Sequence, residues 1–237
     1  MKISTMLILL VCLVTLGSLT AFNKQLKKVY LSGIYKSRFM DMTFTPVKGI
    51  ENIDIQAANL LGVQIEQGDK EGVWINRRVR DNVVFKVNQH TLILDLTSSS
   101  KSQDEREWEG EVIVITKKLN SIATTPYFST KRSELYSALS SSVKGYQADH
   151  MDVQICQNVS FSLDSMQLNT LHAVVGNQAK GGAELVLSAA NKINNAQLDI
   201  PGKSTLTLHD PQIVKTNYNL SDSASVSLSG KMIKLIK

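Results

Sequence analysis

The fold is decided near the C-terminus, where Tyr218–Gly230 reads YNLSDSASVSLSG. Apolar residues occupy every second position at both ends of this stretch, and serine fills much of the remainder. Alternation with period two is typical of β-strands that have one buried face, and the central Ser and Asp residues favour a turn. The stretch therefore predicts two short strands joined by a turn, with serine on the solvent side.

A near copy lies twenty residues earlier, where Leu198–Leu208 reads LDIPGKSTLTL. Weaker copies upstream end at Leu163 and Leu187, so the last apolar residues of successive copies (163, 187, 208, 228) are 24, 21 and 20 residues apart. A period near twenty with two strands per period is typical of a solenoid, in which successive coils stack to bury their apolar sides. We expect burial at six positions of the last two copies: Ile200, Leu206, Leu208, Leu220, Val226 and Leu228.

The predicted fold class is all-β, a solenoid preceded by one N-terminal hydrophobic helix. The alternative is an antiparallel sandwich or barrel, whose strands also alternate between turn signals. After the N-terminus, the strongest helix signal is Lys131–Val143, where Leu135 and Leu139 lie four residues apart. We interpret that segment as a short capping helix or a surface excursion.

An uncharged apolar run of seventeen residues near the N-terminus is long enough, at the short limit, to span a membrane. We interpret it as an uncleaved anchor; the alternative is a removed signal peptide, although Ser18–Ala21 makes a poor cleavage site. The expected organisation is an anchor at 1–22, a basic tether at 23–40 and a β-helix domain at 41–237. The anchor residues are Met6, Leu7, Ile8, Leu9, Leu10, Val11, Cys12, Leu13, Val14, Thr15, Leu16, Gly17, Ser18, Leu19, Thr20, Ala21 and Phe22.

The basic residues bear on orientation and on partners. Lys2 and the amino terminus precede the apolar run, and five basic side chains between Lys24 and Arg38 follow it. The positive-inside rule then leaves the domain in the cytoplasm, whereas its Ser/Thr-rich strands are typical of an exported product. Both orientations stay open, and we expect the domain to face the periplasm or envelope. Nucleic-acid binding is not expected, because the few aromatic residues are not interleaved with the basic clusters.

The front of the domain carries an ordered set of motifs: F-x-x-V-x-G-I at residues 44–50, V-x-I-x-Q-G-D at 63–69, and L-x-S-I at 119–122. Their order and spacing resemble the head GIN domain family, described as auto-transporter adhesin domains of Bacteroidetes-type bacteria. The similarity covers roughly residues 41–237. Its carriers are Phe44, Val47, Gly49, Ile50, Val63, Ile65, Gln67, Gly68, Asp69, Leu92, Val112, Leu119, Ser121 and Ile122.

The resemblance implies a right-handed single-stranded β-helix and an adhesin-like role. The Ser-Gly-x-Ser style turns of that family survive here only as fragments at Gly181-Gly182, Pro201–Ser204 and Ser221–Ser225. The resemblance therefore carries over the fold and assigns no ligand to those turns.

Candidate chemical groups are few. His150 and Asp152 share one strand face without a third metal ligand, and His209-Asp210 lacks the nucleophile elbow of a triad. The loop around Trp108, Lys180-Gly181-Gly182 and the lone Cys156 fit solvated or structural roles better than catalytic ones. The sequence predicts no catalytic, cofactor-binding or metal site, and no cofactor.

Two function classes are consistent with these patterns. The first is a membrane-anchored, non-catalytic envelope or cell-surface adhesin-like module that binds a glycan or a protein. The second is a polysaccharide-active β-helix enzyme, which a cluster of carboxylates on one face of stacked coils would favour. The Ser, Thr, Asn and Lys residues at outward positions of 199–229 favour the first.

Overall fold

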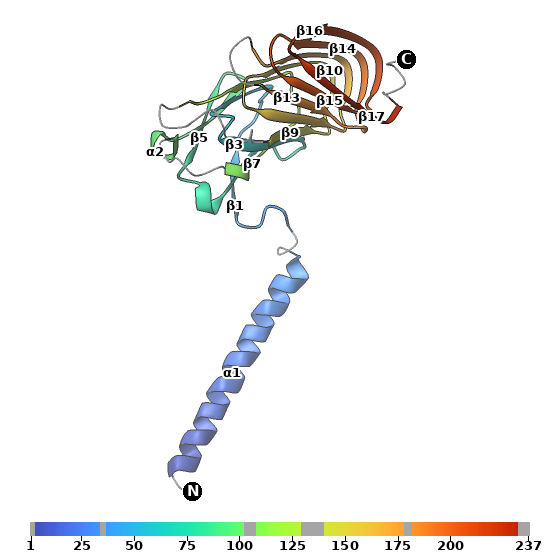
Figure 1. Cartoon of the computed structure of the whole chain (residues 1–237). Helices are drawn as coiled ribbons and strands as arrows, with labels where there is room; N and C mark the ends of the chain where they lie inside the picture. Colours follow the sequence, from blue (N-terminus) through green and yellow to red (C-terminus); the bar gives the residue numbers. More distant parts are fainter. Residues whose placement is uncertain (1–2, 34–36, 102–107, 129–139, 178–181, 232–237) are drawn as a thin grey trace. The chain divides into compact units, whose positions relative to one another are not determined.

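The structure is a computed structural model that describes residues 3–33, 37–101, 108–128, 140–177 and 182–231 (Figure 1). The chain forms two compact units, Met1–Met42 and Thr43–Lys237.

The first unit contains one long helix, α1 (Ile3–Ser32). It includes the predicted anchor residues 6–22 and continues for ten residues beyond Phe22, through Lys24, Lys27 and Lys28. The helix ends where Gly33 adopts a positive φ of 66° and its N–H bonds to the carbonyl of Tyr30. Glycine is the usual residue at this position because it has no Cβ to clash. The predicted N-terminal hydrophobic helix is therefore confirmed.

The second unit is built almost entirely from strands, in two sheets (Figure 1). The nine-stranded sheet, sheet A, has the order β1 (Met42–Pro46), β4 (Gly72–Asn76), β7 (Trp108–Thr116), β3 (Leu61–Gln67), β9 (Ser140–Lys144), β11 (Ser160–Asp164), β13 (Glu184–Leu187), β15 (Thr205–His209), β17 (Ser225–Ser229). The eight-stranded sheet, sheet B, has the order β16 (Gln212–Leu220), β14 (Lys192–Ile200), β12 (Gln167–Val175), β10 (Gln147–Ile155), β8 (Ser121–Thr125), β2 (Asn52–Gln56), β6 (Thr91–Leu96), β5 (Val83–Asn88). Two short helical segments, η2 (Arg77–Val79) and α2 (Ser98–Lys101), lie between strands. The all-β class is confirmed.

The twenty-residue register is confirmed pair by pair. In sheet A, Leu206 lies opposite Val226 and Leu208 opposite Leu228. In sheet B, Leu198 lies opposite Tyr218 and Ile200 opposite Leu220, again in parallel pairing. From β9 onward the chain alternates between the sheets, so the two strands of one sequence repeat belong to different sheets.

A right-handed single-stranded β-helix over residues 41–237 is not confirmed, because both sheets are mixed. In the front half β4 pairs antiparallel with β7, and β5 pairs antiparallel with β6. The β5–β6 pair is a hairpin whose turn includes Gln89 at a φ of 53°. A tight turn with a left-handed residue reverses the chain within one sheet and interrupts the alternation between sheets.

The core lies between the sheets and runs from Ile50 to Leu208. Of the six inward positions predicted in the last two copies, Ile200, Leu206 and Leu208 are fully buried, and Leu228 is half-buried. The prediction is wrong for Leu220 and Val226, which are 43% and 40% exposed. They belong to β16 and β17, the last strands of their sheets, so no further described strand covers them.

Buried polar side chains secure the connections between neighbouring repeats. Asn191 is fully buried; its Oδ1 accepts from the Met166 N–H (2.9 Å) and its Nδ2 donates to the Leu163 carbonyl (2.7 Å). Ser204 Oγ accepts from the Ala183 N–H at 3.0 Å in the same manner. Each side chain satisfies backbone groups of the preceding repeat that the sheets leave unpaired.

The helix expected at Lys131–Val143 is wrong over its last residues, because Ser140–Lys144 forms β9. Ser141 and Val143 are buried and alternate with outward Ser140 and Ser142, as in the other strands of sheet A. Residues 131–139 of that segment lie outside the described residues.

Candidate functional site

One outward-facing row crosses all eight strands of sheet B and is polar at every position. Hydrogen-bonding side chains come into line there because the strands pair in register and their inward neighbours, such as Met151 and Val153, are buried. We call this line the polar row. Its members, from β5 to β16, are Asn88, Thr91, Asn52, Ser121, Asp152, His172, Gln197 and Asn217.

A chain of carboxylates and imidazoles lies at the centre of the polar row. His150 Nε2 lies 2.9 Å from Asp152 Oδ2, and His172 Nδ1 lies 3.2 Å from Asp152 Oδ1. The other ring nitrogen of His172, Nε2, lies 3.1 Å from Asp199 Oδ2. Since a neutral imidazole has one N–H, His172 donates to both carboxylates only as the imidazolium. It then links β10, β12 and β14 across their outward face.

A hollow of about 350 Å³ opens beside this series of carboxylates and imidazoles. Its polar lining comes from Asp152, His172 and Ser121, with Gln154 from the neighbouring row, and its floor holds Ala123 and Val174. The small Ala123 side chain leaves space between the polar groups. The hollow therefore offers donors and acceptors around a shallow apolar base.

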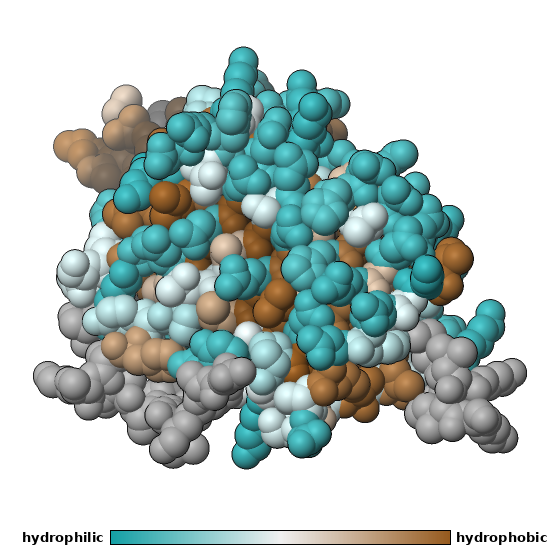
Figure 2. All heavy atoms as spheres, turned by 90° about the horizontal axis from the view of Figure 1, so that it is seen from above, coloured by the Kyte–Doolittle hydropathy of each residue, from teal (hydrophilic) through white to brown (hydrophobic). Residues whose placement is uncertain are grey.

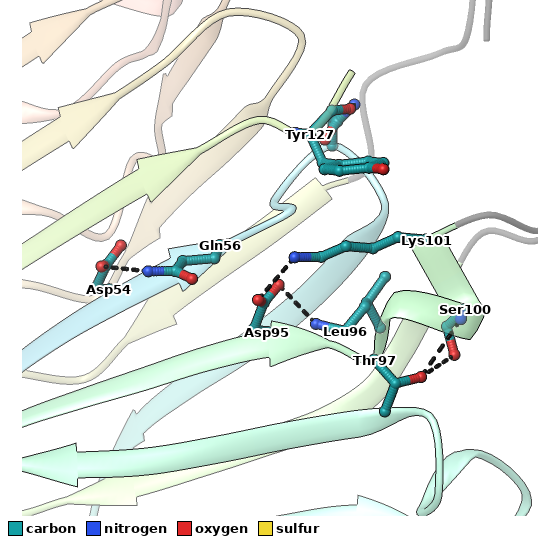
Figure 3. Close-up of polar contacts among 9 residues, drawn as sticks. Asp54, Gln56, Asp95, Leu96, Thr97, Ser100, Lys101 and Tyr127 are labelled. Atoms are coloured by element: carbon teal, nitrogen blue, oxygen red, sulfur yellow. Dashed lines mark hydrogen bonds and ion pairs between the residues drawn. The ribbon is translucent and has the colours of Figure 1, made fainter. Parts of the chain in front are cut away.

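A second group of polar contacts lies at the β5–β6 end of the same sheet (Figure 3). Lys101 Nζ pairs with Asp95 Oδ2 at 2.7 Å, with both side chains about one-fifth exposed (20% and 22%), and lies 5.2 Å from the centre of the Tyr127 ring. Asp54 Oδ2 accepts from Gln56 Nε2 at 3.3 Å. Asp54 Oδ1 is buried and has no hydrogen-bond partner among the described residues. One oxygen of this carboxylate is therefore unsatisfied within the described part of the chain.

Cys156 follows β10 directly and is half-buried. Burial raises the pKa of its thiol, and the negative charge of Asp54 raises it further. A thiol with a raised pKa is a poor nucleophile because the thiolate is the reactive form.

A second hollow, of about 690 Å³, lies where the long strands of sheet B begin. Amide side chains dominate its lining, among them Gln67, Gln147 and Gln167. At its edge Asn169 Nδ2 donates to Asp149 Oδ1 (3.0 Å) and Asn194 Nδ2 donates to Asn169 Oδ1 (3.2 Å). These contacts form a ladder between successive repeats, so Asn169 and Asn194 are already engaged with their neighbours.

The structure separates the other sequence candidates. His209 Nδ1 lies 3.1 Å from Ser229 Oγ, but the Asp210 carboxylate accepts from the Lys231 N–H, so the three side chains form no triad in this structure. Glu107, Lys180 and Gly181 lie outside the described residues, as do the side chains of Trp108 and Glu109. Within the described ranges, no group of three or more His, Cys, Asp and Glu side chains could hold a metal ion.

His150 and Asp152 were expected to share a face, and they do. Sequence analysis missed their link to His172 and Asp199. Asp152 and His172 are twenty residues apart and lie opposite each other. Applying the twenty-residue period to the polar positions, in addition to the apolar ones, would have brought these two together.

Figure 2 shows the face of the molecule on the side where Figure 1 places β16, β14 and β10. Hydrophilic side chains cover most of it, and hydrophobic residues show between them in small areas. Such a surface offers hydrogen bonds over a wide area and few large apolar anchors.

No family model and no curated protein sequence matches the chain. Among solved structures, the fold is similar to that of a protein named a "putative adhesin" from Bacteroides fragilis, with 13% identity, 79% of this chain and 96% of that chain covered, and a TM-score of 0.52. A "putative lipid binding protein" from Parabacteroides distasonis (13% identity, 80% and 96% covered, TM-score 0.41) and a "putative adhesin" from Parabacteroides merdae (9%, 80% and 95%, TM-score 0.38) are more distant in structure.

At 13% identity, the similarity to the Bacteroides fragilis protein concerns the fold alone. It shows that the two proteins share a fold and assigns no role. The head GIN assignment stays a prediction, because no family model matches.

Proposed function

We propose that this protein is a membrane-anchored, non-catalytic binding module of the bacterial cell envelope. The observation that carries the proposal is the combination of an apolar N-terminal helix with a β domain whose sheet B presents a continuous polar row. Helix Ile3–Leu31 is long and apolar enough to cross a membrane. At 1.5 Å per residue, α1 is about 45 Å long and exceeds the roughly 30 Å hydrocarbon core of a bilayer.

Residues 6–22 form the anchor in this proposal. The large apolar side chains from Met6 to Phe22 are at least half exposed, so the described protein does not bury them. Lipid is the environment that accommodates such a surface on a single helix. Lys24, Lys27 and Lys28 follow on the same helix, where they can contact anionic headgroups. The domain boundaries proposed from the sequence, with the β domain beginning at residue 41, fit this arrangement.

The β domain faces the periplasm or the outer envelope in this proposal. The name of the Bacteroides fragilis structure supports a surface location, and so do the hydroxyl-rich outward positions of sheet A. The stacked strands β9–β17 supply the extended flank, and we propose that they form a β-helical section of the domain. Extended flanks of this kind suit long partners.

Reporter fusions after Lys237 test the location. A periplasm-dependent reporter is expected to be active, and a cytoplasm-dependent one inactive. The opposite result would overturn the envelope assignment. An N-terminal epitope tag retained on the membrane-bound protein would show that residues 6–22 are not removed, and its loss would favour a cleaved signal peptide.

A polysaccharide-active enzyme is the second candidate, because Asp152 on β10 and Asp199 on β14 lie on the same face, on either side of β12. Paired carboxylates are the usual catalytic groups of glycoside hydrolysis. Here both carboxylates contact the same imidazole. Release of reducing ends from dextran, mannan or chitohexaose, abolished by Asp152→Asn, would establish the enzyme; no release with the wild type would exclude it for these chains.

A further inference from the structure

We infer that the polar row and the hollow beside Asp152 and His172 bind an uncharged polyhydroxylated chain, that is, a neutral glycan lying across the strands of sheet B. This inference rests on the proposed function, because it names the ligand class of that binding module. The glycan would lie along the polar row, from β8 toward β14, with the hollow at the centre of the bound segment.

The chemistry of the polar row and of the row beside it matches hydroxyl groups. Asp152 in the polar row and Asp199 in the adjacent row supply carboxylate acceptors. Ser121 and the amides of Gln154 and Gln197 can both donate and accept. Sugar hydroxyls also donate and accept, so they can bond to each of these side chains. Hydrogen bonds to ionised carboxylates are stronger than those between neutral groups. The centre of the row therefore has the strongest acceptors.

The spacing of the row matches a repeating ligand. Neighbouring strands lie about 4.8 Å apart, so the row presents a polar side chain at that interval over roughly 30 Å. The adjacent row contains Ala123 and Val174 between its polar members Asp54, Gln154 and Asp199. A ring can rest on this apolar floor while its hydroxyls reach the polar row.

The charges favour an uncharged chain. Asp54, Asp152 and Asp199 carry the negative charge of this part of the face. His150 and His172 are already paired with carboxylates, and the exposed Lys86 lies two strands from Asp54, on β5 and outside the lining of the hollow. A sulfated or uronic chain would bring like charge against these carboxylates, which disfavours its binding. Nucleic acid is disfavoured for the same reason.

A protein partner fits this face less well. Protein interfaces depend on large aromatic or aliphatic anchors that fill pockets. The lining of the central hollow has no Phe, Tyr or Trp side chain, and its apolar floor is provided by Ala123 and Val174. Recognition by strand addition uses sheet edges, and the polar row lies on a sheet face.

The test uses the full chain in detergent micelles, with calorimetric titration of dextran, mannan and chitohexaose as neutral probes and dextran sulfate as the charged counterpart of dextran. At least one neutral chain is expected to bind, and dextran sulfate at least tenfold more weakly than the neutral chain that binds most tightly. Absence of binding to all three neutral chains, or binding of dextran sulfate as tight as that of the best neutral chain, would overturn the inference.

Two variants locate the site, each with a matched control on sheet A. Ala123→Phe fills the hollow without removing a hydrogen bond, and Val186→Phe makes the same kind of change at an outward position of β13. His172→Ala removes the central imidazole, and His209→Ala removes one from β15. We expect at least a tenfold loss of affinity for the first member of each pair and less than a twofold change for the second.

Thermal melts of all four variants separate loss of binding from loss of folding, and Ala123→Phe keeps the test informative if His172→Ala is unstable. Loss of affinity in Gln147→Ala with none in Ala123→Phe would place the ligand at the amide-lined hollow and overturn this site. The reporter fusions after Lys237 are independent of these titrations. Export without glycan binding would therefore refute the inference and leave the proposed location intact.

Discussion

At the scale of single residues, burial decides how much each side chain contributes to stability. Leu208 is fully buried between the sheets, while its neighbour Thr207 faces outward and donates to Glu184 Oε1 at 3.1 Å. Two adjacent residues thus differ in role because successive side chains of a strand point to opposite faces. The outward position is not free of constraint, since an acidic residue at 207 would meet the Glu184 carboxylate.

Leu208→Asp is expected to lower the free energy of unfolding by about 4 kcal/mol or more, because it removes a buried apolar side chain and buries an unpaired carboxylate. Ser227→Asp, on the exposed outward face of β17, is expected to change it by less than about 0.5 kcal/mol. Urea unfolding followed by circular dichroism measures both. Equal losses would contradict the inward and outward assignments.

Tyr146 is a buried residue whose hydroxyl is fully used: it donates to the Glu66 carbonyl and bonds to Thr116 Oγ1, both at 2.8 Å. Burial raises its pKa to about 12, partly opposed by the hydrogen bonds with Thr116. Because the folded pKa lies above the ordinary value of 10.0, this stabilisation is complete below pH 10 and is lost as the pH rises toward 12.

Tyr146→Phe is expected to cost about 1–3 kcal/mol at neutral pH, since it leaves buried acceptors unsatisfied. It should also remove the part of the alkaline destabilisation that Tyr146 causes. Unfolding free energies measured from pH 8 to pH 12 for both proteins check this. A variant with the same decline between pH 10 and pH 12 as the wild type would assign the effect to other groups.

At the scale of elements, the parallel strands depend on the connections between them. The turns after sheet A strands carry buried side chains that bond to the preceding repeat, as Asn191 does with Met166 and Leu163. Such a group fixes the twenty-residue stacking at the corner, where strand pairing stops. The apolar alternation sets which face is inward, and the corner residues set where each strand begins.

Asn191→Ala is expected to destabilise the protein by about 2–4 kcal/mol, because the Met166 N–H loses its acceptor and the Leu163 carbonyl keeps only the Ser188 N–H as a donor. Asn217→Ala, at an exposed position of β16, serves as the control and should cost less than about 0.5 kcal/mol. Thermal unfolding of both variants under one condition provides the comparison. A mild effect of Asn191→Ala would mean that water replaces the side chain at this corner.

At the scale of the whole β domain, the two sheets end together at β16 and β17. Val214, Tyr218, Leu220 and Val226 are exposed there by 83%, 41%, 43% and 40%. The residues opposite Tyr218, Leu220 and Val226 in the preceding repeat are fully buried: Leu198, Ile200 and Leu206. The last strands thus keep the apolar pattern of an interior repeat at the edge of the sheets.

Exposed edge strands with apolar side chains promote association between chains. We expect Val214→Lys to reduce concentration-dependent self-association of the full chain in detergent, with the thermal midpoint unchanged. Light scattering over a range of protein concentrations measures the effect, and Ser142→Lys on the outward face of β9 is the control. Equal association of wild type and Val214→Lys would show that this edge does not mediate contacts.

The sequence by itself determined the all-β class, the N-terminal helix and the register of the last repeats, because these depend on local alternation and a fixed period. Leu206 and Val226, twenty residues apart, had to be neighbours once the two copies were aligned. It also determined that His150 and Asp152 share a face, since the side chains of residues i and i+2 on a strand point to the same side of the sheet.

Only the tertiary structure decided the mixed pairing of the front strands, the exposure of the last repeat and the polar row. The β5–β6 hairpin depends on one turn residue, Gln89, whose left-handed conformation the sequence does not signal. The exposure of Val226 depends on whether another strand stacks on β17, and alternation within one strand carries no information about its neighbours. The row from Asn88 to Asn217 joins residues that are far apart in the chain, and side chains so distant meet only when the strand order of sheet B is known.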